Sequence, residues 1–230
     1  MKRFFQAILV VLLFSPSAVA QESDLGNWAI YFGNKKLNDK WNIHHEVQYR
    51  NYNAIGDLEQ LLLRTGLGYN LSPNNNNLLL GYGFIRSENY VVTNVNGTFE
   101  EVKNAVDEHR IYQQFITKQS FGRVSLQHRY RIEERFILGE FENDFKMRFR
   151  YFLATNVALS NDKLVPKTFY ASAYNEIFIN AQNQLFDRNR IYGGIGYKVT
   201  DNLKFEVGYM NQRFNVGNRD QVNLIANFSF

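Results

Sequence analysis

Arginine and glutamate side chains occur at alternate positions in several segments of the chain. Arg129, Arg131, Glu133 and Arg135 show this spacing most clearly. Side chains two residues apart lie on one face of a β-strand, and neighbouring strands are about 4.8 Å apart. We therefore expect a continuous charge belt on one face of a sheet. The charge belt comprises Glu46, Arg50, Arg110, Arg129, Arg131, Glu133, Arg135, Arg148, Arg150, Glu176, Arg188 and Arg190.

The charge belt has two possible roles. In the first, Glu133 and Glu176 are counter-ions that let the arginines pack, and the belt plugs the interior of a barrel. In the second, the belt is a narrow constriction that prefers anions, because Arg and Lys outnumber Glu on that face. Arginine suits both roles, since its planar fork bonds several acceptors at once.

A surface lipid-modifying enzyme is the alternative function, and it would need a serine beside a histidine. His45 and His128 fall on the apolar faces of their segments, whereas Ser125 has the opposite parity to His128. Residues of opposite parity point to opposite faces of a strand. No pairing of nucleophile and base follows from the spacing, and we expect no enzymatic activity.

No metal site or cofactor is predicted. His44 and His45 are adjacent and point to opposite faces of a strand. Glu140, Glu142 and Asp144 share a short acidic segment, for which a solvated loop is the default interpretation.

A period of two dominates the chain after residue 25. From Trp41 to Arg50, apolar and polar residues alternate throughout, which is typical of strands with one apolar face. Segments of 10–14 residues suit tilted strands that cross a membrane, which need about 9–11 residues with a short overhang. We expect strands at 27–36, 41–52, 59–71, 77–87, 107–118, 123–136, 144–157, 167–179, 188–199, 203–213 and 220–230.

The connections between these segments alternate between short and longer ones, as in barrels with short periplasmic turns and longer extracellular loops. Within the longest connection, 86–106, Asn96-Gly97 predicts a projecting hairpin. If neighbouring segments run in opposite directions and the last one ends at the periplasmic side, segment 27–36 also runs towards the periplasm. The barrel would then begin on the extracellular side. Either a short first strand precedes segment 27–36, or residues 21–36 are irregular. We predict an all-β chain that forms a single antiparallel transmembrane β-barrel of about 10–12 strands, with twelve favoured because bacterial barrels have even counts.

The apolar faces of these strands are expected to contact lipid, and the arginine-rich faces to line the interior. Aromatic residues on the apolar faces would form girdles at the membrane surfaces. This set comprises Trp28, Trp41, Tyr49, Tyr69, Tyr82, Tyr130, Phe145, Tyr151, Phe169, Tyr197, Phe205, Tyr209 and Phe228.

The two ends of the chain indicate export. Residues 1–20 resemble a signal peptide, with Lys2 and Arg3 before an apolar run and Ala18-Val19-Ala20 as the cleavage site. Cleavage after Ala20 leaves residues 21–230 as one barrel domain. At the other end, Phe228 and Phe230 close an alternating apolar strand, which resembles the recognition signal of the outer-membrane barrel assembly machinery.

Composition is consistent with this address. Mean hydropathy is −0.38 and no second long apolar run occurs, which excludes a helical membrane protein. There is no cysteine, and the net charge falls from +4 to +2 when Lys2 and Arg3 are removed. Nucleic-acid-binding domains are more strongly basic, so we expect no nucleic acid partner.

The chain resembles the outer-membrane barrel family catalogued as domain of unknown function 2490. The resemblance rests on Glu46-x-Gln48-x-Arg50, Arg129-x-Arg131-x-Glu133-x-Arg135, Asn175-Glu176, Phe186-Asp187-Arg188-Asn189-Arg190 and Gly193-Gly194-Ile195-Gly196-Tyr197. It implies a barrel in the outer membrane of a Gram-negative bacterium, in contact with lipid and lipopolysaccharide. It implies no established activity and no catalytic residues.

Overall fold

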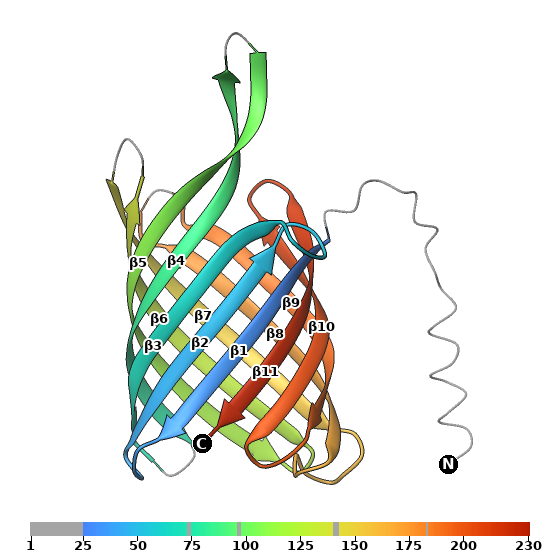
Figure 1. Ribbon diagram of the computed structural model, residues 1–230. Helices are drawn as coiled ribbons and strands as arrows, with labels where there is room; N and C mark the ends of the chain where they lie inside the picture. Colours follow the sequence, from blue (N-terminus) through green and yellow to red (C-terminus); the bar gives the residue numbers. More distant parts are fainter. Residues whose placement is uncertain (1–24, 73–74, 96–97, 140–142, 183) are drawn as a thin grey trace, which may run out of the picture.

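Eleven strands close into one barrel in the part of the chain that the structure describes (Figure 1). The computed structural model describes residues 25–72, 75–95, 98–139, 143–182 and 184–230. The proposed signal peptide lies outside these residues. The strands are β1 (Gly26–Lys36), β2 (Trp41–Asn51), β3 (Leu58–Asn70), β4 (Asn76–Val95), β5 (Thr98–Phe121), β6 (Val124–Leu138), β7 (Asn143–Ala158), β8 (Thr168–Asn180), β9 (Phe186–Lys198), β10 (Leu203–Phe214) and β11 (Asn218–Ser229).

Each strand pairs with the next along the chain in antiparallel fashion, and β1 closes the barrel by pairing with β11 in parallel. The parallel register runs from Gly26 opposite Gln221 to Asn34 opposite Ser229. The backbone of Phe230 extends this seam, donating to Asn34 and accepting from Lys36. The seam therefore connects the first and last strands of the wall along most of their length.

The predictions of twelve strands and of a wholly antiparallel barrel are wrong. With hairpin connections throughout, an odd number of strands makes the first and the last run in the same direction, so a parallel pair must close the ring. β1 is a regular wall strand of 11 residues, so the alternative of an irregular segment at this position is also wrong. The sequence predicted that β1 runs in the same direction as the last strand, and the parallel pairing of β1 with β11 confirms this.

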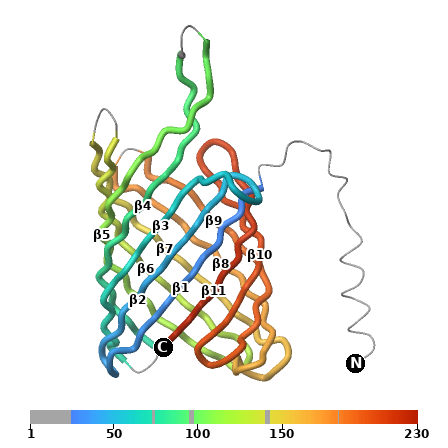
Figure 2. The backbone as a smooth tube through the Cα atoms, viewed as in Figure 1, coloured from blue at the N-terminus to red at the C-terminus, as the bar shows by residue number. Residues whose placement is uncertain are grey.

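The two rims of the barrel differ mainly in one hairpin (Figure 2). β4 and β5 have 20 and 24 residues and stay paired as far as Val95 opposite Thr98. They project well beyond the wall, as the sequence predicted, although the turn residues 96–97 lie outside the described residues. We call this end the hairpin rim and the end where the chain terminates the C-terminal rim. The connection 159–167 at the C-terminal rim is longer than the connection 215–217 at the hairpin rim. The expectation of short turns at one rim and longer loops at the other therefore does not hold for every connection.

The interior is wider than that of a small barrel and is filled by large side chains. Eight strands give an interior that ordinary side chains just fill, and the diameter grows with strand number. Here arginine, tyrosine, tryptophan and phenylalanine occupy the inner positions, and Tyr112, Tyr170, Phe178 and Trp28 are completely or almost completely buried.

Glycines on the inner face make room for tyrosine rings. A Cβ atom on Gly196 would lie 2.1 Å from Cζ of Tyr170, and one on Gly208 would lie 2.4 Å from Cζ of Tyr192. The rings thus lie directly on the backbone of a neighbouring strand. The glycines Gly194 and Gly196 of β9 thus provide space for tyrosine side chains, whereas Gly193 faces open space.

The described residues form no helix that is both long enough and apolar enough to cross a membrane.

Candidate functional site

The charge belt lies on the inner face of the barrel, where strand register brings acids opposite bases. Glu133 is opposite Arg148 across β6 and β7, and Glu176 is opposite Arg190 across β8 and β9. Two like-charged pairs also face each other, Arg131 with Arg150 and Arg110 with Arg135. Like charges directly opposite destabilise a sheet, so these pairs depend on carboxylates placed diagonally to them.

Glu133 is the centre of the belt and is 0% exposed. Its carboxylate accepts hydrogen bonds from Arg150 at 2.5 Å and from Arg148 at 2.6 Å. Arg131 and Arg110 approach the same carboxylate at 3.4 and 3.5 Å. One carboxylate therefore binds four guanidinium groups from β5, β6 and β7.

Glu176 forms a second centre that extends the belt to β9. It accepts from Arg150 at 2.6 Å and from Arg129 at 2.7 Å, and Arg190 lies 3.8 Å away. Arg150 thus bridges Glu133 and Glu176, and joins the two centres into one network.

Smaller groups complete the belt on either side. Glu108 pairs with Arg110 at 2.6 Å and with Arg135 at 2.8 Å. Glu46 accepts from Arg64 of β3 at 2.5 Å. Arg64 is not among the charge-belt residues predicted from the sequence, and the structure adds it to the network through this contact.

Asp187 is a belt residue that the sequence reasoning missed. Its carboxylate pairs with Arg148 at 2.6 Å and with Arg188 at 3.0 Å. The residue opens β9 beside Phe186, and the prediction began that strand at residue 188. Asp187 also lies at a register shift between β8 and β9, where Phe178 is opposite Arg188 and Ile179 is opposite Phe186. It therefore joins the belt although its parity is opposite to that of Arg188, which alternation alone could not predict.

Trp28 was assigned to the lipid-facing girdle, and this prediction is wrong. Its side chain is buried in the lumen, where the guanidinium carbons of Arg50 and Arg190 lie 3.6 and 4.9 Å from its ring centre. The prediction failed because β1 is apolar on both faces, with Ile30 inside and Tyr31 outside. The alternation of polar and apolar residues therefore could not show which face of β1 points into the lumen. Phe178 has a similar role, with Arg150 4.4 Å and Arg190 4.7 Å from its ring centre.

A small cavity lies within the belt, on the side nearer the hairpin rim, and we call it the Arg-lined cavity. Its volume is about 50 Å³. Side chains from seven strands, β2, β3, β5, β6, β7, β8 and β9, converge on it. They are Arg50, Gln60, Leu62, Arg64, Arg110, Arg135, Arg148, Arg150, Phe178, Arg188 and Arg190.

Positive charge exceeds negative charge in this part of the lumen. The belt arginines and Arg64 number ten, and Glu46, Glu108, Glu133, Glu176 and Asp187 number five, which leaves an excess of 10 − 5 = 5 positive charges. No carboxylate is among the described residues that line the Arg-lined cavity.

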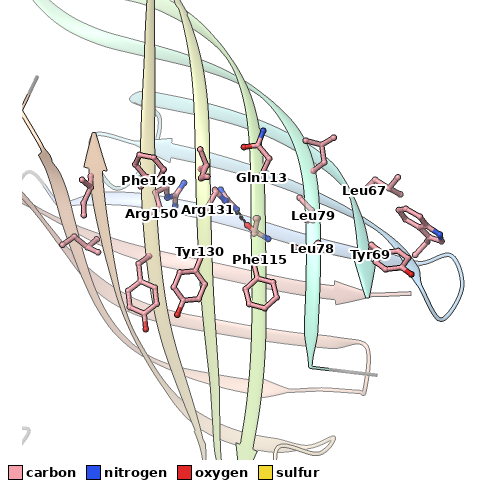
Figure 3. A pocket seen from close by; sticks show the side chains of 17 residues that line it. Leu67, Tyr69, Leu78, Leu79, Gln113, Phe115, Tyr130, Arg131, Phe149 and Arg150 are labelled. Carbon is pink, nitrogen blue, oxygen red and sulfur yellow. Dashed lines mark hydrogen bonds between the residues drawn. The ribbon is translucent and has the colours of Figure 1, made fainter. Parts of the chain in front are cut away.

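The outer wall exposes many large apolar side chains, and Figure 3 shows those that line one pocket on it. Phe115, Tyr130 and Phe149 project from β5, β6 and β7, and Arg131 and Arg150 come from the same strands with the opposite parity. A pocket of about 820 Å³ is lined chiefly by outward apolar side chains from β2 to β8.

Three histidines on the outer wall each contact a tyrosine hydroxyl. The pairs are Tyr31 with His45 at 3.0 Å, Tyr82 with His109 at 2.6 Å, and Tyr151 with His128 at 2.9 Å. Ser125 contacts the hydroxyl of Ser120 at 3.3 Å. The described residues contain no group of three acidic or histidine side chains that is arranged to hold a metal ion, and Glu140 and Glu142 lie outside them.

The terminal aromatics are on the outer wall at the C-terminal rim. The rings of Phe228 and Phe230 are in contact in a tilted arrangement, with their centres 5.1 Å apart, and Phe230 also contacts His45.

Comparison with protein families gives one match over most of the chain. The model of the family described as "Protein of unknown function (DUF2490)" matches residues 25–223. The chain belongs to this family. In this DUF2490 member, the matched residues include every charge-belt position and ten complete strands. Comparisons with curated proteins and with solved structures give no significant match.

Proposed function

We propose that this DUF2490 member is a non-enzymatic barrel of the outer membrane whose lumen is closed by the charge belt. The observation that carries the proposal is the convergence of seven strands on one cavity of about 50 Å³. An open pore would leave a continuous water-filled passage at this level. The burial of belt residues such as Glu133, Arg131 and Arg148 around this small cavity supports a filled cross-section.

The outer wall supports insertion in a membrane. On β7, outward apolar residues extend from Phe145 to Leu153. Eight residue steps cover about 26 Å along a strand, or about 20 Å along the barrel axis at the tilt of roughly 40° that is typical of barrels. Outer-membrane barrels have an apolar band about 25 Å tall. A soluble barrel would instead expose this large apolar surface to water.

The proposed export route follows from the ends of the chain. A signal peptide over residues 1–20 would direct export to the periplasm, and Phe228 and Phe230 would present the terminal aromatic strand to the assembly machinery. In the membrane, the outer wall would contact lipid and lipopolysaccharide.

A narrow pore that prefers anions is the second candidate function. The excess of arginine over carboxylate in the lumen favours it, because rings of positive side chains select anions. For this function the belt would have to open, which requires separation of ion pairs such as Arg150 with Glu133.

A surface lipid-modifying enzyme is the third candidate. The outward histidines contact tyrosine hydroxyls rather than serines in the described residues. This arrangement offers no activated nucleophile of the serine type, and it favours the non-enzymatic barrel. Phospholipase and acyltransferase assays on purified protein would test this candidate.

The absence of cysteine allows a direct test of membrane location and orientation. A membrane-impermeant maleimide is applied to three single-cysteine variants. They are Phe99→Cys at the projecting hairpin, Asp39→Cys at the opposite rim and Val207→Cys on the outer wall. In intact cells we expect labelling of Phe99→Cys only. Asp39→Cys should react after the outer membrane is permeabilised, and Val207→Cys only after solubilisation and unfolding. Labelling of Val207→Cys in untreated cells would contradict a lipid-facing wall.

A further inference from the structure

The arginines around the Arg-lined cavity are unequally supplied with counter-ions. Arg148 and Arg150 each bind two carboxylates. Arg50 binds none within ion-pair distance among the described residues, and it donates only to the amide oxygens of Gln48 and Gln60. Its charge is therefore buried with no described carboxylate within ion-pair distance.

Arg190 is in a similar position on the other side of the lumen. Its Nε donates to Gln212 at 2.6 Å, and its nearest described carboxylate, Glu176, is 3.8 Å away. Arg50 and Arg190 both pack on the ring of Trp28. Two guanidinium groups on one buried ring repel each other, and burial strengthens that repulsion because the local dielectric is low.

A third arginine has an unused donor. Nε of Arg64 is buried and has no hydrogen-bond partner among the described residues, although its Nη1 binds Glu46. A buried N–H group without a partner costs free energy. An acceptor within the cavity would satisfy such a donor.

The cavity has the size of a small oxyanion. A site for one water molecule needs about 10–15 Å³, so about 50 Å³ holds roughly three to five oxygen-sized groups. A tetrahedral group with four oxygens, such as a phosphate, fits this volume. Guanidinium forks match the oxygens of phosphate groups in bidentate geometry.

Exposure increases from the belt centre towards the hairpin rim, which gives the direction of entry. The side chain of Arg150 is 6% exposed, whereas that of Arg188 is 26% exposed. Arg188 lies close to the end of β9 at the hairpin rim. An anion would therefore meet Arg188 first and then Arg50 and Arg190.

We propose that the Arg-lined cavity binds a phosphate group, held by Arg50, Arg64 and Arg190, that enters from the hairpin rim. The proposal rests on the proposed function only in making that rim the extracellular one. The phosphate group can belong to free inorganic phosphate or to the headgroup of a phosphorylated lipid, and the chemistry of recognition is the same for both.

The test is calorimetric titration of the detergent-solubilised full chain with inorganic phosphate, with sodium chloride of equal ionic strength as the reference. We expect saturable binding that weakens at least tenfold in Arg50→Gln and in Arg190→Gln. Arg50→Lys keeps the charge but loses the fork, and it should bind with intermediate affinity. Arg86→Gln, an exposed arginine of the outer face at the hairpin rim, is the matched control and should bind like the unchanged protein.

A second arm uses mixed micelles that contain lipid A, with micelles of a zwitterionic lipid as the reference. Lipid A binding that depends on Arg50 without binding of inorganic phosphate would identify a lipid headgroup as the source. The proposal is overturned if neither probe binds, or if Arg86→Gln weakens binding as much as Arg50→Gln does. Because these titrations are made in detergent, their failure leaves the maleimide test of membrane location unaffected.

Folding of the variants is checked by unfolding in urea without phosphate. Replacement of a buried, unpaired charge by a neutral amide should leave the unfolding midpoint of Arg50→Gln unchanged or higher. Added phosphate should raise the midpoint of the unchanged protein and not that of Arg50→Gln. An equal increase in both proteins would contradict binding at Arg50.

Discussion

The carboxylate of Glu133 on β6 accepts a 2.5 Å hydrogen bond from Arg150 on β7, entirely shielded from solvent. Three further arginines surround the same carboxylate. Loss of one partner from a buried ion pair leaves uncompensated charge, which is more damaging than replacement of the whole group by apolar residues. Glu133 is therefore the position at which the belt is most sensitive to substitution.

We expect Glu133→Gln to destabilise the folded barrel by about 3–5 kcal/mol, because four guanidinium groups lose their shared counter-ion. Unfolding in urea, followed by tryptophan fluorescence in lipid vesicles, measures the change. Glu134→Gln on the outer face of the same strand is the matched control, and it should change stability by less than about 0.5 kcal/mol. Equal effects of the two substitutions would show that the belt contributes no special stability.

The glycines of β9 provide a comparison between the two faces of one strand. Gly196→Ala places a methyl group against the buried ring of Tyr170, and we expect a loss of about 1–3 kcal/mol from overpacking. Gly193→Ala faces open space and should be close to neutral or slightly stabilising. Urea unfolding of both variants measures the difference, and a larger loss for Gly193→Ala would place the wrong face of β9 inside.

The two tryptophans, Trp28 and Trp41, lie on opposite sides of the barrel wall, and they are the only ones in the chain. In vesicles of brominated lipid, the fluorescence of the Trp28→Phe variant, which retains Trp41, should be strongly quenched. The Trp41→Phe variant retains Trp28 inside the lumen and should be quenched much less. Strong quenching of Trp28 by lipid would contradict its place in the belt.

A pH-dependent contact ties the projecting hairpin to the neighbouring loop. Lys103 lies 2.5 Å from the carboxylate of Asp57, and Tyr90 donates to it at 3.0 Å. The hydrogen bond from Lys103, aided by that from Tyr90, lowers the pKa of Asp57 below its ordinary value of 3.8. Because the pKa is lower in the folded protein, the contact stabilises the hairpin at neutral pH and is lost as pH falls through the lowered pKa.

Amide hydrogen exchange in the hairpin tests this contact. After correction for intrinsic rates, exchange near Tyr90 and Lys103 should accelerate as the pH falls below about 3.8. Asp57→Asn should show the faster exchange already at neutral pH, with no further acid response. Identical profiles for both proteins would mean that Asp57 does not hold the hairpin.

Much of the architecture followed from alternation. Eleven segments were identified in the sequence, and the described part of the chain forms a wall of eleven strands. The agreement arises because polar and apolar residues alternate with a period of two in nearly all of these segments. The prediction of twelve strands was wrong because the even strand count of bacterial barrels was given more weight than the eleven segments that the alternation indicated. The closing pair of β1 and β11 is not encoded in any local pattern, since it joins residues about 190 positions apart in sequence.

The site was predictable only where alternation was clear. The arginines of β6 fell on one face because Tyr130 and Ile132 mark the other, whereas Trp28 was misplaced because β1 is apolar on both faces. The Arg-lined cavity was not predictable, because it depends on barrel closure bringing Arg50 of β2 and Arg190 of β9 to the same ring.

Single-channel recording of the folded protein in a planar bilayer tests the closed lumen most directly. If the charge belt closes the lumen as proposed, the inserted barrel should show no steady conductance. Protection of the wall from protease verifies that the protein has inserted. Glu133→Gln and Arg150→Gln should introduce transient openings as the network loosens. A steady conductance with anion preference in the unchanged protein would contradict the closed barrel and favour the narrow pore.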